Sequence, residues 1–136
     1  MIHAMTPQSI ALVIGLVIFL LLVGFHGWMG HIARRAQGQA VTDLPAGKNE
    51  ALHKQGRLVL YFYTPHCGHC KSMTPRIDSL AQQYDHLFKV DVSQARPWVA
   101  ALNVRATPTT VLISDGIIQR VLLGPLSDQA IVQLLR

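Results

Sequence analysis

The sequence predicts an α/β domain with a mixed central sheet, preceded by one N-terminal transmembrane helix. Residues 10–29 form a run without Lys, Arg, Asp or Glu, and strand-like segments alternate with helical segments after residue 48. Asp115-Gly116 is a strong hairpin signal near the end of the chain. Alternating strands and helices favour parallel crossovers, whereas a hairpin joins antiparallel strands. The sheet is therefore expected to be mixed.

The N-terminal third of the chain has the composition of a membrane-spanning helix. All 12 Lys and Arg and all 7 Asp and Glu residues lie at or after Arg34. Residues 10–29 give about 20 largely apolar positions, enough to cross a hydrocarbon core of about 30 Å, and Trp28 lies where an interfacial aromatic is expected. A buried core helix would carry a polar stripe, which this run lacks. We expect residues 10–29 to contact a lipid bilayer, after a short tail at residues 1–9.

A cleaved signal peptide is the main alternative to a retained anchor. Signal peptides begin with a basic region and end at a small-residue cleavage site. Residues 1–9 contain no Lys or Arg, and residues 30–33 offer no convincing cleavage site.

The orientation in the membrane follows from the charges beside the apolar run. Arg34 and Arg35 follow the run, so the positive-inside rule places the C-terminal part in the cytoplasm. We expect a single-pass protein of a bacterial inner membrane, with a periplasmic domain as the alternative orientation.

The chain after the apolar run is expected to comprise a linker and one domain. Residues 30–47 are mostly polar, with Gly and Pro, and form a juxtamembrane linker in which an edge strand is expected to start near residue 40. A short helix is expected at residues 48–55. Residues 58–63 are apolar and aromatic, which is typical of a strand buried on both faces. The domain is expected to span residues 48–136.

Further helix and strand signals alternate through the rest of the domain. Apolar residues recur at helical spacing after residue 70, and Pro75 is expected to kink that helix. Ser127 can serve as the N-cap of a final helix. The remaining expected elements are strands at residues 87–92, 109–113 and 117–123 and a short helix at residues 96–102.

Both cysteines of the chain lie in the tetrapeptide Cys67-Gly68-His69-Cys70, shortly after the strand expected at residues 58–63. The spacing allows a disulfide across one turn, and that turn is expected to open a helix. A helix N-terminus presents unpaired N–H groups and partial positive charge, which stabilise a thiolate. Because a thiolate is the species that attacks disulfides, the motif indicates thiol–disulfide exchange, which needs no bound cofactor.

Other functions for this motif and this composition are less consistent with the sequence. The cysteines and their neighbouring histidines could bind zinc, but four ligands within five residues cannot easily surround a metal tetrahedrally. A purely structural disulfide closing so short a loop would add little stability. The basic residues after Arg35 are scattered, without a dense run of Lys and Arg, so no nucleic-acid binding is expected. Because the candidate zinc ligands lie so close together in the sequence, we also expect no metal site.

The segment YFYTPHCGHCKSMTP, residues 61–75, resembles the active-site segment of thioredoxin-like proteins. Its CGHC tetrapeptide is typical of protein disulfide isomerase domains, and residues 105–109 resemble the family's cis-proline loop. The resemblance covers roughly residues 40–136 and implies a thioredoxin-like three-layer α/β/α fold. It also implies an enzyme, a thiol–disulfide oxidoreductase that acts on protein thiols and disulfides and is recycled by a redox partner, and the apolar run at residues 10–29 would anchor it to a membrane.

The resemblance implies roles for the residues of the motif. Cys67 would be the exposed attacking thiol, and Cys70 would resolve the mixed disulfide. A protonated His69 would lower the pKa of the Cys67 thiol and make the pair more oxidising than a Gly-Pro version. His66, which stands where the family commonly has an aromatic residue, could add to this effect. Thr107 and the cis-proline candidate Pro108 would lie beside the sulfurs and bind substrate backbone.

One departure from the family affects the expected proton handling. The family usually buries an acidic residue six positions before the first cysteine, and this chain has Tyr61 there. Lys89 matches a lysine that lies near that acid. Tyr61 and Lys89 are therefore candidates for proton handling at Cys70, by a route that differs from an ordinary thioredoxin. The missing acid also motivates an alternative function, a non-enzymatic interaction or assembly module at the membrane.

Overall fold

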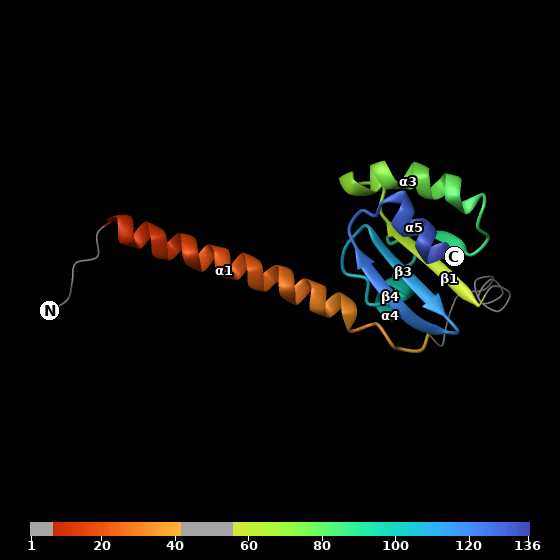
Figure 1. Cartoon of the computed structure of the whole chain (residues 1–136), viewed down its shortest axis with the longest axis horizontal. Coiled ribbons are helices and arrows are strands. Elements are labelled where there is room, and N and C mark those ends of the chain that lie inside the picture. Colours follow the sequence, from red (N-terminus) through yellow and green to blue (C-terminus); the bar gives the residue numbers. More distant parts are fainter. Residues whose placement is uncertain (1–6, 42–55) are drawn as a thin grey trace. The chain divides into compact units, whose positions relative to one another are not determined.

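The computed structural model describes residues 7–41 and 56–136 and has two compact units, Met1–Ile32 and Ala33–Arg136 (Figure 1). The predicted helix at residues 48–55, most of the tail at residues 1–9 and the later part of the expected edge strand lie outside the described residues. The expected division into tail, anchor, linker and domain stays a prediction. Each unit is described by itself.

Helix α1 (Pro7–Arg34) is apolar around its circumference. Its segment Pro7–Trp28 has 22 residues and a mean hydropathy of 2.7, and no residue in the most hydrophobic stretch of this segment is buried. A helix with this pattern needs apolar surroundings, and this one is long enough to span a membrane. Signal sequences share the same length and composition. The helix could therefore be a membrane span or a signal sequence.

The second unit is built on a mixed sheet of four strands, β1 (Arg57–Tyr63), β2 (Leu87–Asp91), β3 (Thr109–Ser114) and β4 (Ile117–Leu123). Their order is β2-β1-β3-β4. β1 is parallel to β2, while β3 pairs antiparallel with both β1 and β4. At the turn between β3 and β4, Asp115 and Gly116 have φ angles of 52° and 75°, as a tight hairpin requires. The predicted mixed sheet and hairpin are confirmed.

The domain has three layers because helices cover both faces of the sheet: α3 (Gly68–Ala81), α4 (Arg96–Ala101) and α5 (Asp128–Leu135) (Figure 1). Alternate residues of β1 enter two separate cores. Leu60 packs in the core that contains Trp98 of α4, whereas Val59 packs in the core that contains Ile77 of α3 and Ile131 of α5. This double burial explains why β1 is continuously apolar and confirms the expected strand.

The chain before the domain adds to the outer edge of β4. Ala40 forms an antiparallel bridge with Ile117. The N–H of Gly38 donates to the carbonyl of Ile118 at 2.7 Å, and the N–H of Ile118 donates to the carbonyl of Gln39 at 3.0 Å. Near residue 40, where an edge strand is expected, the described residues form one isolated bridge, and the strand itself stays a prediction because residues 42–44 lie outside the described part of the chain.

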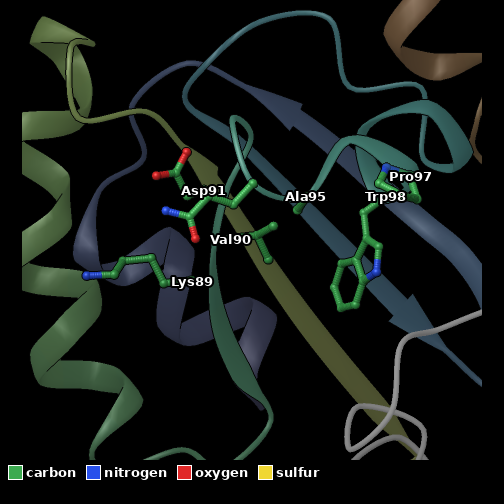
Figure 2. Close-up of a pocket in the computed structure, with 7 residues that line it drawn as sticks. Lys89, Val90, Asp91, Ala95, Pro97 and Trp98 are labelled. Carbon is green, nitrogen blue, oxygen red and sulfur yellow. The ribbon is translucent and has the colours of Figure 1, made fainter.

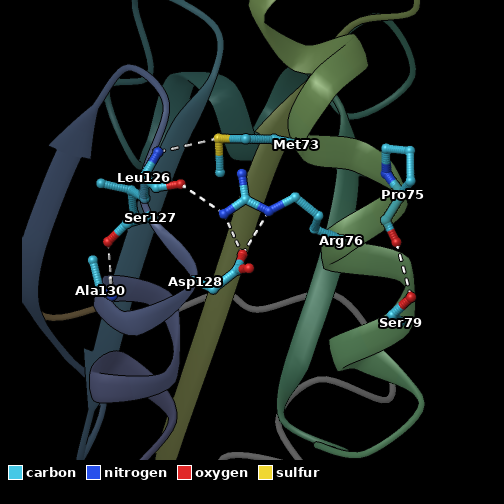
Figure 3. A network of polar contacts seen from close by, with 8 residues as sticks. All are labelled: Met73, Pro75, Arg76, Ser79, Leu126, Ser127, Asp128 and Ala130. Atoms are coloured by element: carbon cyan, nitrogen blue, oxygen red, sulfur yellow. Dashed lines mark hydrogen bonds and ion pairs between the residues drawn. The ribbon is translucent and has the colours of Figure 1, made fainter.

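A set of polar contacts holds the loop after β4 against α3 (Figure 3). Arg76 of α3 forms an ion pair with Asp128, and its Nη2 donates to the carbonyl of Leu126 at 3.4 Å. The N–H of Leu126 donates to Sδ of Met73 at 3.3 Å. Ser127 is the N-cap of α5, as predicted, because its hydroxyl accepts from the N–H of Ala130. Pro75 lies inside α3, and a kink there stays a prediction.

Candidate active site

Cys67 occupies the N-cap position of α3. Its φ of −78° and ψ of 116° are extended, and its Sγ accepts a hydrogen bond from the N–H of Cys70 at 3.2 Å. The N–H groups of the first helical turn lack partners within the helix, so an N-cap atom that accepts from them is stabilised when it carries negative charge. The geometry therefore favours a thiolate at Cys67 once the sulfur is reduced.

The two cysteines are joined by a disulfide and differ in access. Their Cα atoms are 5.2 Å apart. Cys67 is partly exposed, whereas the side chain of Cys70 on the inner face of α3 is only 1% exposed. An incoming sulfur can therefore reach Cys67 but not Cys70. This asymmetry suits one cysteine for contact with a second molecule and the other for an internal step.

The loop before β3 lies directly beside Cys67. The Thr107-Pro108 peptide bond is cis, and the carbonyl oxygen of Thr107 is 3.5 Å from Sγ of Cys67. The residue that follows β4 also holds this loop, because the N–H of Gly124 donates to the carbonyl of Pro108 at 2.9 Å. The structure thus places Thr107 and Pro108 where the sequence predicted. Their role in binding substrate backbone stays a prediction.

Both histidines of the motif are exposed, and the charge of His66 interacts with the carboxylate of Asp91. The hydroxyl and the N–H of Ser93 donate to Asp91 at 2.7 and 2.9 Å and lower the pKa of that carboxyl, and the charge of His66 lowers it further. Asp91 ends β2 and borders a surface pocket of about 440 Å³ that Trp98 also lines (Figure 2). His69 lies on the first turn of α3, next to Cys70.

Tyr61 is fully buried beneath α3, at the position where the family usually has an acid. Burial raises the pKa of its hydroxyl, an effect that Thr74 and Lys89 partly oppose. In the described structure the hydroxyl does not reach hydrogen-bonding geometry with any group, and neither does the buried hydroxyl of Thr110, the cross-strand neighbour of Tyr61. At neutral pH Tyr61 is therefore protonated, and it can donate a hydrogen bond but cannot act as a base.

Lys89 lies beside Tyr61 on the adjacent strand β2. Its Nζ forms an ion pair with Asp78 of α3 at 2.6 Å and lies 5.2 Å from the centre of the Tyr63 ring. The structure thus brings the two predicted proton-handling residues together. Sequence reasoning missed Asp78 and Thr110, because Thr110 follows only from the pairing of β1 with β3 and Asp78 only from the packing of α3 beside β2.

The comparison with known families agrees with this geometry. Residues 42–136 match the family model described as Thioredoxin. The chain belongs to the thioredoxin family. The three-layer domain with a mixed four-stranded sheet is the thioredoxin fold, and the Cys67–Cys70 disulfide fits the CXXC motif of this family.

Individual thioredoxins match part of the chain. A thioredoxin from Aspergillus fumigatus is 35% identical over 69 residues, which is 49% of this chain and 64% of that protein. Thioredoxin 1 from Synechococcus elongatus is 33% identical over 80 residues, 57% of this chain and 74% of that protein. The structure of a mutant thioredoxin from Halobacterium salinarum superimposes with a TM-score of 0.58 at 28% identity, covering 74% of this chain and 84% of that one. The chain thus spans less than two thirds of the Aspergillus relative.

Proposed function

We propose that this thioredoxin-family chain is a thiol–disulfide oxidoreductase that exchanges disulfides with protein substrates, anchored to a membrane through residues 10–29. The observation that carries this proposal is the asymmetry of the cysteine pair. Cys67 is partly exposed at the start of a helix, and it is bonded to Cys70, which is buried one turn further along. A redox partner must return the pair to its starting state after each exchange.

The exchange proceeds in two displacements. The reduced Cys67 thiolate attacks one sulfur of a substrate disulfide, which forms a mixed disulfide and releases the other substrate sulfur as a thiolate. Cys70 then loses its proton and attacks Sγ of Cys67, so that the second substrate sulfur leaves. Two electrons pass from the cysteine pair to the substrate, whose two thiolates take up protons. Because the two cysteine Cα atoms are only 5.2 Å apart, the second step is intramolecular and fast.

His69 and His66 are proposed to tune the pair, and Thr107 and Pro108 to bind substrate backbone. A protonated imidazole next to Cys67 stabilises the thiolate and therefore the reduced form. Stabilising the reduced form makes the disulfide a stronger oxidant. Both histidines are exposed at the start of α3.

Tyr61 and Lys89 are proposed to assist the second displacement. Thr74, whose hydroxyl acts on Tyr61, lies on α3 four residues after Cys70 and hence on the same helix face. The buried Tyr61 hydroxyl is a donor in this region, and Lys89 supplies a nearby positive charge. We infer that Tyr61 donates a hydrogen bond to the Cys70 thiolate as it forms.

A non-enzymatic interaction or assembly module at the membrane is the second candidate function. The observation that favours it is Tyr61, because a phenol with a raised pKa cannot replace a carboxylate as a proton acceptor. The two functions differ in whether catalytic turnover depends on the cysteines, which the first experiment below measures.

The first experiment tests the cysteine assignments by insulin reduction with dithiothreitol as reductant. Cys67→Ser should reduce turnover to the uncatalysed rate, because no accessible sulfur remains. Cys70→Ser should instead accumulate a mixed disulfide with the substrate, visible by mass spectrometry. Undiminished turnover in Cys67→Ser would count against the enzyme and favour the interaction module.

The role of Tyr61 is tested by Tyr61→Phe, which removes only the hydroxyl. We expect the mixed disulfide to resolve about ten- to a hundredfold more slowly, because a hydrogen bond to a charged group contributes about 1.5–3 kcal/mol. Rapid-quench trapping of the mixed disulfide gives the rate. Tyr63→Phe, which removes a hydroxyl from the same face of β1, is the matched control and should resolve at the wild-type rate. Equal rates in the two variants would remove Tyr61 from the mechanism.

The role of His69 is tested by His69→Pro. Removing the imidazole destabilises the thiolate, so the reduction potential should become more negative by some tens of millivolts, on the order of the differences between family members. Equilibration against glutathione buffers gives the potential. Lys71→Gln changes charge at the next exposed position after Cys70 and should shift the potential less. No shift in His69→Pro would show that His69 does not tune the pair.

The proposed location is a bacterial inner membrane with a single retained helix and a cytoplasmic domain. Arg34 and Arg35 at the end of α1 support this orientation, which would make the chain a reductase, whereas a periplasmic domain would favour oxidation or isomerisation. A green fluorescent protein fused after Arg136 should fluoresce, and an alkaline phosphatase fused there should be inactive. The reverse pattern would assign the periplasm, and loss of the first 29 residues from the mature chain would indicate a signal peptide.

A further inference from the structure

The surface around Cys67 carries unneutralised positive charge. Lys71 is exposed on the first turn of α3, directly after Cys70. Arg105 is exposed on the loop before β3, two residues before Thr107, whose carbonyl oxygen lies 3.5 Å from Sγ of Cys67. Neither side chain forms an ion pair within the described residues. Two cations therefore lie on the two segments that adjoin the reactive sulfur, and the Arg105 side chain keeps its charge because its Nε donates only to the neutral amide oxygen of Asn103, at 2.7 Å.

The acidic groups at the same end of the domain do not cancel this charge. Among the described residues, Asp128 is already paired with Arg76, and Asp91, which stays charged although it accepts two hydrogen bonds from Ser93, is one carboxylate against two cations. His69 adds further positive charge when it is protonated. A molecule that approaches Cys67 therefore meets a positive surface.

Apolar contacts offer little alternative for recognition at this surface. Within the described part of the domain, Ile117 and Leu123 are the exposed large hydrophobic residues, 40% and 38% exposed respectively. Only Leu123, whose β3 partner is Thr109, lies at the Cys67 end of the sheet. The position before Cys67, where the family commonly has an aromatic residue, is the exposed His66. Charge is thus the feature that can distinguish one partner from another here.

We propose that the preferred substrates are protein disulfides flanked by Asp or Glu, which Lys71 and Arg105 attract to Cys67. This inference rests on the proposed function and adds a substrate class to it. Complementary charge mainly accelerates encounter, by about tenfold or more where several charges act together. The preference should weaken with salt, because the Debye length falls from about 30 Å at 0.01 M to about 3 Å at 1 M ionic strength.

The test uses the reduced full chain in micelles of an uncharged detergent and three synthetic peptides. The peptides share one disulfide loop and differ only in flanking residues, which are Asp, Asn or Lys. Single-turnover rates of exchange are measured at low and high ionic strength. We expect the order Asp, Asn, Lys at low salt, with about threefold or more between successive peptides, and nearly equal rates at high salt.

The variant Lys71→Gln with Arg105→Gln separates charge recognition from sulfur reactivity. The informative quantity is the ratio of the Asp-peptide rate to the Asn-peptide rate, because a change in Cys67 reactivity affects both rates equally. The ratio should fall toward one in this double variant and stay unchanged in Arg120→Gln, which removes an exposed charge from the middle of β4. Rates that ignore flanking charge, or a ratio that survives the double variant, would overturn the inference and leave the oxidoreductase intact. Failure to react with any peptide would overturn both.

Discussion

The site depends on one constraint, the burial of β1 on both faces of the sheet. Because β1 lies between β2 and β3, its alternate residues are fixed by two independent cores, and the strand has little freedom to shift or tilt. The chain leaves this strand at Tyr63 and reaches Cys67 within four residues, so the position of β1 fixes where the first turn of α3 begins. The sulfur, the helix N–H groups and the Thr107 carbonyl are consequently held in one arrangement.

Elements with a strong local signal were predictable from the sequence. Continuous apolarity identified β1, Asp115-Gly116 identified the β3–β4 turn, and Ser127 identified the start of α5. These predictions succeed because each signal acts within a few residues, through side-chain alternation, backbone φ or capping. The cysteine pair was equally local, since the motif contains both sulfurs.

Contacts between distant segments were not predictable in the same way. The approach of Asp91 to His66 and of Asp78 to Lys89 depends on strand register and on the rotation of α3, which no local pattern specifies. The resemblance to the family did identify Tyr61 and Lys89, but Thr110, the neighbour of Tyr61 on β3, emerged only from the sheet pairing. The surroundings of Tyr61 therefore follow from the pairing of β1 with its neighbours rather than from any local pattern.

The hydrogen bonds between residues 38–41 and the start of β4 also affect how readily copies of the domain can associate through the edge of the sheet. An uncovered outer strand offers unpaired N–H and C=O groups to any neighbouring chain, and such edges promote association into extended sheets. Hydrogen bonds from Gly38, Ile118 and Val41 use some of these groups within the chain itself. The short segment that follows α1 thus occupies backbone groups at the start of β4 and leaves fewer of them free to pair with another chain.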